Sequence, residues 1–256
     1  MRVFVIGDVV GKNGVSHLQS VLPAFKRTYG VDLCVANGEN SSESNGITPE
    51  SAEELFSYGV DVITTGNHAF RHRAIYDYYD EHEFVLRPVN FPPDAPGRGF
   101  CIVDKGSVRV GIVNLMGTMY LESLDNPFRA MEAVLPELSD CRIKIVDFHA
   151  EATSEKRAMG FFLDGNVSAV FGTHTHVQTA DEQILPGGTG YMTDVGMTGT
   201  VQSVLGVKPD IIIQKFRSNL PQRFLFEEGP AMLCGCIFDI DNKTGLTTSV
   251  ERICLT

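Results

Sequence analysis

Short runs rich in Val and Ile recur along this chain and alternate with segments of helical character. Runs that fit buried strands cover residues 2–7, 32–37, 61–66, 108–115, 142–148 and 167–172. Segments that fit helices cover residues 14–30, 48–59 and 154–165. In the second of these, Thr48 can serve as the N-cap and Pro49 occupies the first helical position. The alternation is typical of an α/β layered fold.

The last third of the chain has a different pattern. The stretches 191–196, 231–241 and 247–255 look like strands joined by turns, and they predict a second, more antiparallel sheet. Segment 204–230 is mixed in character and punctuated by proline, so we expect an excursion near the functional site or a subunit contact. No internal repeat or linker divides the 256 residues. We therefore expect a single domain over residues 1–256.

Composition restricts the class of protein and its partners. The formal net charge is −11 without any block of Lys and Arg, which argues against binding long nucleic acids and leaves a small anionic substrate open. No apolar run approaches the ~20 residues that cross a bilayer, and the first apolar run is too short for a signal peptide. We therefore expect no membrane partner and a cytoplasmic location. The six scattered cysteines are expected to be buried, reduced thiols.

Polar side chains follow the predicted strands at the points where these strands end. They are Asp8, Glu39, Asn40, Asn67, His68, His149, His174 and His176. Open α/β sheets bind ligands in the crevice outside the carboxyl ends of their strands. Taken singly, each residue has a structural explanation as a turn, a helix cap, a core histidine or a solvated strand end. Taken together, carboxylates, an amide and imidazoles at successive strand ends are the donors that a two-metal site needs.

The run "FGTHTH" contains two of the chain's seven histidines. A strand turns successive side chains to opposite faces, so His174 and His176, with Cα atoms about 6.5 Å apart, could both face one pocket. Neutral imidazole is the commonest side-chain metal ligand. The mixture of oxygen and nitrogen donors suits manganese, iron or zinc better than calcium.

The motifs "GDVVG", "NGEN", "TGNH", the isolated His149 and "GTHTH" occur in the order and approximate spacing of the calcineurin-like metallophosphoesterases. Throughout its length the chain resembles the bacterial YmdB-type subgroup, including "NGENS", "TTGNH", "DFHAE", "FGTHTHVQTAD" and "MTDVGMTG". The broader superfamily has a histidine in place of Val10 and a bridging aspartate in place of Glu39, and the YmdB-type proteins share both replacements. The resemblance implies a four-layer αββα metallophosphoesterase sandwich, an α/β fold of two mixed sheets flanked by helices.

The resemblance also implies a ligand set for two metal ions, bridged by Glu39. The set is Asp8, Glu39, Asn40 and His176 for one ion, and Glu39, Asn67, His149 and His174 for the other. Iron or manganese is the implied metal, with zinc left open, and His68 occupies the position of the proton donor. The implied substrates are 2′,3′-cyclic nucleotides, opened to nucleoside monophosphates, and the implied assembly is a homo-oligomer.

These residues lead to a hypothesis of phosphodiester hydrolysis. Two divalent ions with the Asp8 and Glu39 carboxylates would have a net charge of about +2, which attracts phosphate. A hydroxide bridging the ions, formed because a metal lowers the pKa of water from about 15.7 to ~7, would attack phosphorus while His68 protonates the departing ribose oxygen. The same cluster could serve a phosphomonoesterase, a 3′,5′-cyclic nucleotide phosphodiesterase or a non-catalytic nucleotide-sensing regulatory protein. Candidates to stack on a nucleotide base are Phe70, Phe91 and Tyr120.

Overall fold

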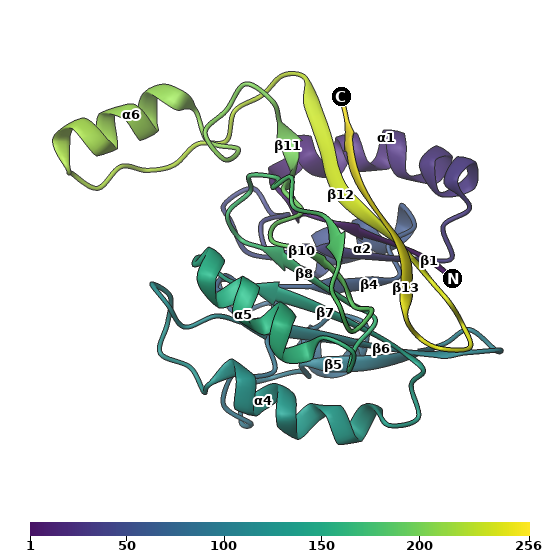
Figure 1. Ribbon diagram of the computed structural model, residues 1–256. Helices are drawn as coiled ribbons and strands as arrows, with labels where there is room; N and C mark the ends of the chain where they lie inside the picture. Colours follow the sequence, from purple (N-terminus) through teal and green to yellow (C-terminus); the bar gives the residue numbers. More distant parts are fainter.

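The computed structural model of the protein describes residues 1–256 and shows two β-sheets packed face to face (Figure 1). The first sheet contains, in spatial order, β2 (Asp8–Val9), β11 (Met197–Thr200), β12 (Ala231–Ile240), β1 (Arg2–Ile6), β3 (Leu33–Asn37) and β4 (Val62–Thr64), and β13 (Thr247–Leu255) pairs with β12. The second contains β5 (Phe100–Asp104), β6 (Arg109–Met116), β7 (Ile143–His149), β8 (Ala169–Thr173), β10 (Gly190–Met192) and β9 (Gln183–Ile184). Both sheets mix parallel and antiparallel pairs, which confirms the predicted fold class.

Helices cover the outer face of each sheet and complete four layers (Figure 1). The first sheet is covered by α1 (Gly11–Tyr29), α2 (Pro49–Ser57) and α3 (Ile75–Glu81), and the second by α4 (Pro127–Val134), the short 3₁₀ helix η1 (Leu135–Leu138) and α5 (Thr153–Leu163). Alternate residues of β1 enter different cores: Phe4 packs toward the helices, and Val5 packs toward the second sheet. Burial on both faces explains why the parallel strands are almost continuously apolar.

The predicted elements are present with small shifts at their ends. Each predicted Val- and Ile-rich run overlaps an observed strand. The Thr48 hydroxyl accepts a hydrogen bond from the backbone N of Ser51 at 3.3 Å, which confirms Thr48 as the N-cap of α2. Helix α1 begins at Gly11 rather than at residue 14, and the Gly11 N–H donates to the carbonyl of Asn40 at 2.8 Å. The start of α1 is therefore tied to the loop after β3.

The prediction that the late strands form a separate antiparallel sheet is wrong. Strand β12 pairs antiparallel with β1 and β11, so the C-terminal part of the chain completes the first sheet. The second sheet is formed instead by the strands from β5 to β10. The physical reason lies in β12, whose residues from Leu233 to Phe238 are buried on both faces, as a central position between layers requires.

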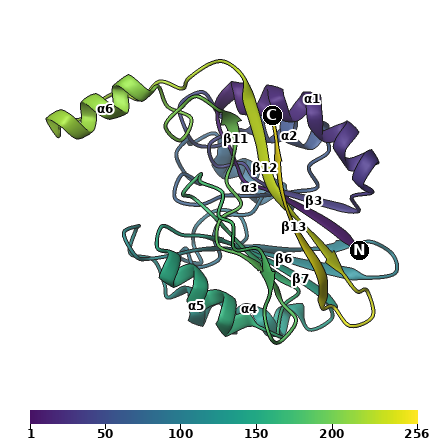
Figure 2. The same cartoon turned by 45° about the horizontal axis from the view of Figure 1, so that its top comes forward.

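The segment 204–230 leaves the body as an arm that carries α6 (Pro209–Ser218), and the arm projects from the sandwich in both views (Figures 1 and 2). The returning part of the arm lines a cavity beside His68, so the predicted excursion near the site is confirmed. Its role as a subunit contact stays a prediction. None of the helices is long and apolar enough to cross a membrane.

Candidate metal centre

The carboxyl ends of the parallel strands of both sheets meet at one edge of the sandwich, and the predicted site residues gather there. Asp8 follows β1, Glu39 and Asn40 follow β3, and Asn67 and His68 follow β4. From the second sheet, His149 is the last residue of β7, and His174 and His176 follow β8. Asp8, Glu39 and His149 are at most 1% exposed, so the centre is closed to bulk water on its inner side.

One half of the cluster is formed around Asp8. Asp8 Oδ1 lies 3.4 Å from His176 Nε2, and Asn40 Nδ2 lies 3.3 Å from the same nitrogen. Asp8 Oδ2 accepts a hydrogen bond from the backbone N of His174 at 3.0 Å. Asp8 Oδ1 is fully buried and accepts no hydrogen bond. A buried carboxylate oxygen without a donor is costly unless a cation binds it.

The other half is formed around His149. Its Nε2 lies 3.0 Å from Asn67 Oδ1, 3.1 Å from His174 Nδ1 and 3.3 Å from Glu39 Oε1. One ligand atom each from Glu39, His149 and His174 lies within 4.8 Å of the other two, a spacing that one metal ion can satisfy. Glu39 Oε1 is also 3.4 Å from Asn40 Nδ2, so Glu39 contacts both halves of the cluster.

The electrostatics of the cluster favour a cation. Burial raises the pKa of the Glu39 carboxyl, but the His149 and His68 imidazoles outweigh burial and hold the pKa well below its usual range. The pKa of Asp8 is likewise lowered, because His176 outweighs the effect of burial. Burial, helped by the nearby His149, lowers the pKa of His174 to about 4, which leaves a neutral imidazole with a lone pair to donate.

His149 is held from behind by a buried polar network that sequence reasoning missed. Its Nδ1 lies 2.9 Å from the Thr173 hydroxyl, which donates to Asp147 Oδ1 at 2.8 Å. Thr64 donates to the other oxygen of Asp147. An Nδ1–H directed at Thr173 leaves the Nε2 lone pair for a metal. Burial raises the pKa of the Asp147 carboxyl to about 7. An aspartate inside the apolar run "KIVDF" was the available signal for this network.

His174 and His176 do not reach the site by strand alternation, so that part of the prediction is wrong. Strand β8 ends at Thr173, and φ is +96° at His174 and +62° at His176, in the left-handed region that few non-glycine residues adopt. Between the two histidines, Thr175 donates from its backbone N and from its hydroxyl to Asp194 Oδ2, at 3.2 and 2.7 Å. The tertiary contacts of the turn, rather than the strand, direct the imidazoles.

Asp194 is itself held by a buried ion pair, which sequence reasoning also missed. Lys156 Nζ lies 2.7 Å from Asp194 Oδ2, and both side chains are 1% exposed. The backbone N of Gly196 donates to the other oxygen of Asp194 at 2.8 Å. Asp194 lies within the motif "MTDVGMTG", but nothing in the sequence of α5 distinguishes Lys156 from a solvated lysine.

A cavity of about 710 Å³ opens beside His68. It is lined by Lys12, Asn13, Glu43, Ser44, Asn45, His68, Arg71 and residues 222–228 of the arm. Phe224 and Phe226 are the aromatic residues of this lining. Of the aromatic residues proposed to stack on a base, Phe70 and Phe91 pack against each other, with ring centroids 5.2 Å apart, and Tyr120 is 84% exposed outside the cavity. The arm supplies the aromatic side chains instead.

The residues present fit a metal centre. Carboxylate, amide and imidazole donors converge from five segments, the carboxylates are ionised, and one buried carboxylate oxygen lacks a hydrogen-bond donor. Oxygen and nitrogen donors without thiolate are typical of manganese, iron and zinc sites. All the cysteines are free thiols, and none is among these donors. Their predicted burial is confirmed except at Cys254, which is exposed because β13 pairs on one side only, with β12.

Known proteins resemble the chain over nearly its full length. Residues 4–253 match the family described as YmdB-like protein. The 2′,3′-cyclic-nucleotide 2′-phosphodiesterase of Bacillus subtilis (strain 168) is 43% identical over 254 residues, which are 99% of this chain and 96% of that protein. A crystal structure of a novel phosphatase from Mycoplasma pneumoniae has a TM-score of 0.95 at 34% identity and covers 100% of this chain and 93% of its own. A crystal structure of a hypothetical protein from Thermus thermophilus has a TM-score of 0.94 at 39% identity, with 99% and 98% covered.

Proposed function

Because the chain belongs to the YmdB-like family and is a phosphoric ester hydrolase, we propose that it opens 2′,3′-cyclic nucleotides to nucleoside monophosphates at a centre of two metal ions. The observation that carries the proposal is the convergence of buried donors around Asp8 and Glu39 next to a cavity large enough for a nucleotide. The substrate class comes from the printed activity of the Bacillus subtilis relative.

The metal ligands in this proposal divide according to the contacts described above. Asp8, Glu39, Asn40 and His176 would hold one ion, and Glu39, Asn67, His149 and His174 the other. Glu39 suits the bridging role because its Oε1 lies 3.3 Å from His149 Nε2 and 3.4 Å from Asn40 Nδ2, one residue from each half. When bound, ions of manganese or iron would supply a nucleophilic water of lowered pKa and positive charge at the phosphoryl oxygens.

His68 is the proposed proton donor. Its backbone N donates to Glu39 Oε2 at 2.9 Å, and its Nδ1 lies 2.9 Å from Asn40 Oδ1. An Nδ1–H directed at Asn40 leaves Nε2 to carry the proton that the departing ribose oxygen needs when the P–O bond breaks. The ring is partly exposed and lines the cavity, so it lies where a substrate can approach.

The Mycoplasma pneumoniae structure, named as a phosphatase, favours a second candidate, a phosphomonoesterase using the same residues. Turnover of 2′,3′-cyclic AMP, 3′,5′-cyclic AMP and a phosphomonoester by one preparation loaded with manganese or ferrous iron distinguishes the candidates. Preferential opening of the 2′,3′ ring supports the proposal. Activity confined to the phosphomonoester or to the 3′,5′ ring would overturn the substrate assignment.

The role of His68 has a separate test. We expect His68→Ala to lower kcat for the cyclic nucleotide by ~10² to 10⁴ because the general acid is lost. Metal content, measured by mass spectrometry, should stay that of the unmodified protein, since His68 is not a ligand in the proposal. His82→Ala, a surface histidine away from the cluster, is the control and should keep full activity. Two bound metals without turnover in the unmodified protein would instead favour a nucleotide sensor.

A further inference from the structure

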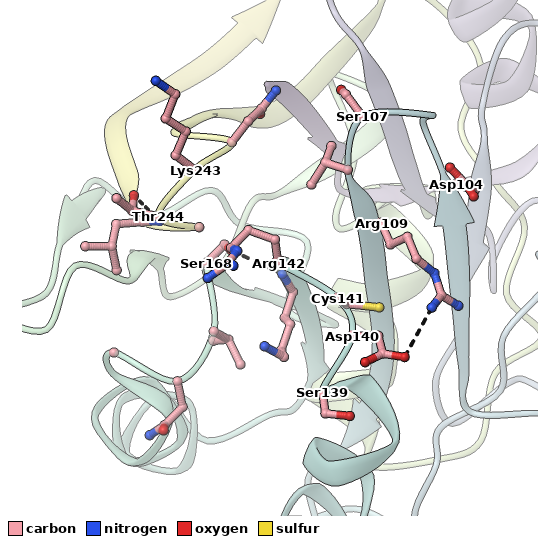
Figure 3. Close-up of a pocket in the computed structure, with 18 of the residues that line it drawn as sticks. Asp104, Ser107, Arg109, Ser139, Asp140, Cys141, Arg142, Ser168, Lys243 and Thr244 are labelled. Carbon is pink, nitrogen blue, oxygen red and sulfur yellow. Dashed lines mark hydrogen bonds and ion pairs between the residues drawn. The ribbon is translucent and has the colours of Figure 1, made fainter.

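A second cavity of about 790 Å³ lies at the opposite ends of β7 and β8 from the metal centre (Figure 3). Strand β7 separates the two sites by about 20 Å, at ~3.3 Å per residue. The cavity is enclosed by the turn between β5 and β6, the segments that precede β7 and β8, and the turn between β12 and β13. Its lining residues include none of the proposed metal ligands, so the cavity is a separate site.

The lining of this cavity is positively charged in a chain of net charge −11. Four cations face two carboxylates: Arg109, Arg142, Lys144 and Lys243 against Asp104 and Asp140. Arg109 Nη1 lies 3.6 Å from Asp140 Oδ2, but the two side chains are 46% and 80% exposed, so this pair contributes little stability. Arg142, Lys144 and Lys243 form no ion pair with any residue of the chain.

The unpaired cations are carried by ordered backbone. Asp241 Oδ1 accepts hydrogen bonds from the backbone N of Lys243 at 2.9 Å and of Thr244 at 2.8 Å, which fixes the turn between β12 and β13. A Cβ on Gly245 would lie 2.3 Å from the carbonyl oxygen of Arg142, so this turn packs directly on the segment that carries Arg142. In Figure 3, Arg142 lies between this turn and the Arg109–Asp140 pair.

We propose that this cavity binds a small ligand that carries a diphosphate group. The planar guanidinium of Arg142 can donate two parallel hydrogen bonds to phosphate oxygens, and the Lys144 and Lys243 ammonium groups add charge. Two cations in excess of carboxylates match a ligand with at least two negative charges. The volume lies in the range of small-molecule sites, and the acidic surface of the whole chain disfavours a long polyanion. Inorganic diphosphate and a nucleoside 5′-diphosphate both have this chemistry.

The first test measures local protection, because diphosphate can also reach the metal centre. Metal-loaded protein is acetylated on its amines with and without inorganic diphosphate, and the rates at individual lysines are followed by mass spectrometry. We expect diphosphate to slow acetylation of Lys243 and Lys144 by roughly fivefold or more, because a bound anion covers these amines. Lys208, on the arm, should react at an unchanged rate. Protection confined to Lys12, beside His68, would overturn the proposal.

The second test uses variants with exposed substitutions that should leave the fold intact. Arg142→Ala with Lys243→Ala removes two cations from the cavity, and Lys208→Ala with Arg217→Ala removes two exposed cations from the arm. The dissociation constant of diphosphate, read from protection of Lys144, should rise at least about tenfold in the first variant and stay unchanged in the second. Equal weakening in both would reduce the effect to net charge and overturn the proposal.

A titration with ADP identifies the source of the diphosphate. An affinity equal to that of inorganic diphosphate assigns the inorganic ion, and a tighter affinity assigns a nucleotide whose nucleoside also contacts the cavity. If neither compound protects Lys144 at millimolar concentration, the proposal fails. The readout is independent of phosphodiesterase turnover, so an error in the proposed function leaves this test unaffected.

Discussion

His149 and the His174–His176 pair face the same site from two different kinds of backbone. His149 ends a buried parallel strand, and its ring is directed by the pleat and by Thr173 behind it. His174 and His176 lie in left-handed conformations after β8, and the residue between them is held by Asp194, which is itself paired with Lys156. A strand can place a ligand by its own geometry, whereas a strained turn needs support from distant residues.

The sharpest way to break the turn is to remove Lys156. We expect Lys156→Met to lower the free energy of unfolding by about 3 to 5 kcal/mol, because it leaves the buried Asp194 carboxylate unpaired. Urea denaturation measures this change. Lys12→Met is the matched control, since the Lys12 and Glu43 side chains are 78% and 68% exposed and their pair should contribute less than about 1 kcal/mol. Equal losses in the two variants would contradict a specific role of the buried pair.

The strand side can be broken at Gly66. A Cβ at this position would lie 2.1 Å from His149 Cδ2, so Gly66→Ala must displace the imidazole. We expect a loss of about 1 to 3 kcal/mol of stability from overpacking, together with a lower metal content. Gly106→Ala tests backbone strain alone, because no atom lies within 4 Å of its Cβ although φ is +77°. Full metal content in Gly66→Ala would show that His149 is not needed as a ligand.

A matched pair of threonines sharpens the comparison with a smaller effect. Thr173 and Thr175 each donate a hydroxyl hydrogen bond to a buried aspartate, at 2.8 and 2.7 Å. We expect each Thr→Val change to cost about 1 kcal/mol of stability and to weaken metal binding by ~10- to 100-fold. Thr173→Val should affect the ion held by His149, whereas Thr175→Val should affect both ions, because His174 and His176 belong to different ions in the proposal. Metal titration followed by calorimetry separates one weakened site from two.

The sequence predicted those parts of the site that depend on a single strand. Asp8, Glu39, Asn67 and His149 follow directly from where Val- and Ile-rich runs end, since parallel strands bring their carboxyl ends to one edge. The resemblance to a known family predicted the division of the donors between two ions, and this division stays a proposal. The layered fold could be predicted because buried parallel strands have a strong periodic signal.

What could not be predicted depends on contacts between distant segments. The position of β12 beside β1 follows from burial on both faces, which a local apolar run does not reveal. The left-handed turn at His174 and His176 is supported by Asp194 and Lys156, which the fold brings together from the loop after β10 and from α5. The aromatic residues beside His68 come from the arm, whose mixed composition gave no strand or helix pattern for their placement.

The division of the donors between the two sheets has a consequence for the synthesis of the chain. Asp8, Glu39 and Asn67 come from the first sheet, and His149, His174 and His176 come from the second, so neither sheet alone has a complete set. A chain emerging from the ribosome cannot assemble the centre before residue 176 is free and the sheets have docked. Capture of metal would then be one of the last steps of maturation, and truncated chains would not compete for scarce ions in the cell.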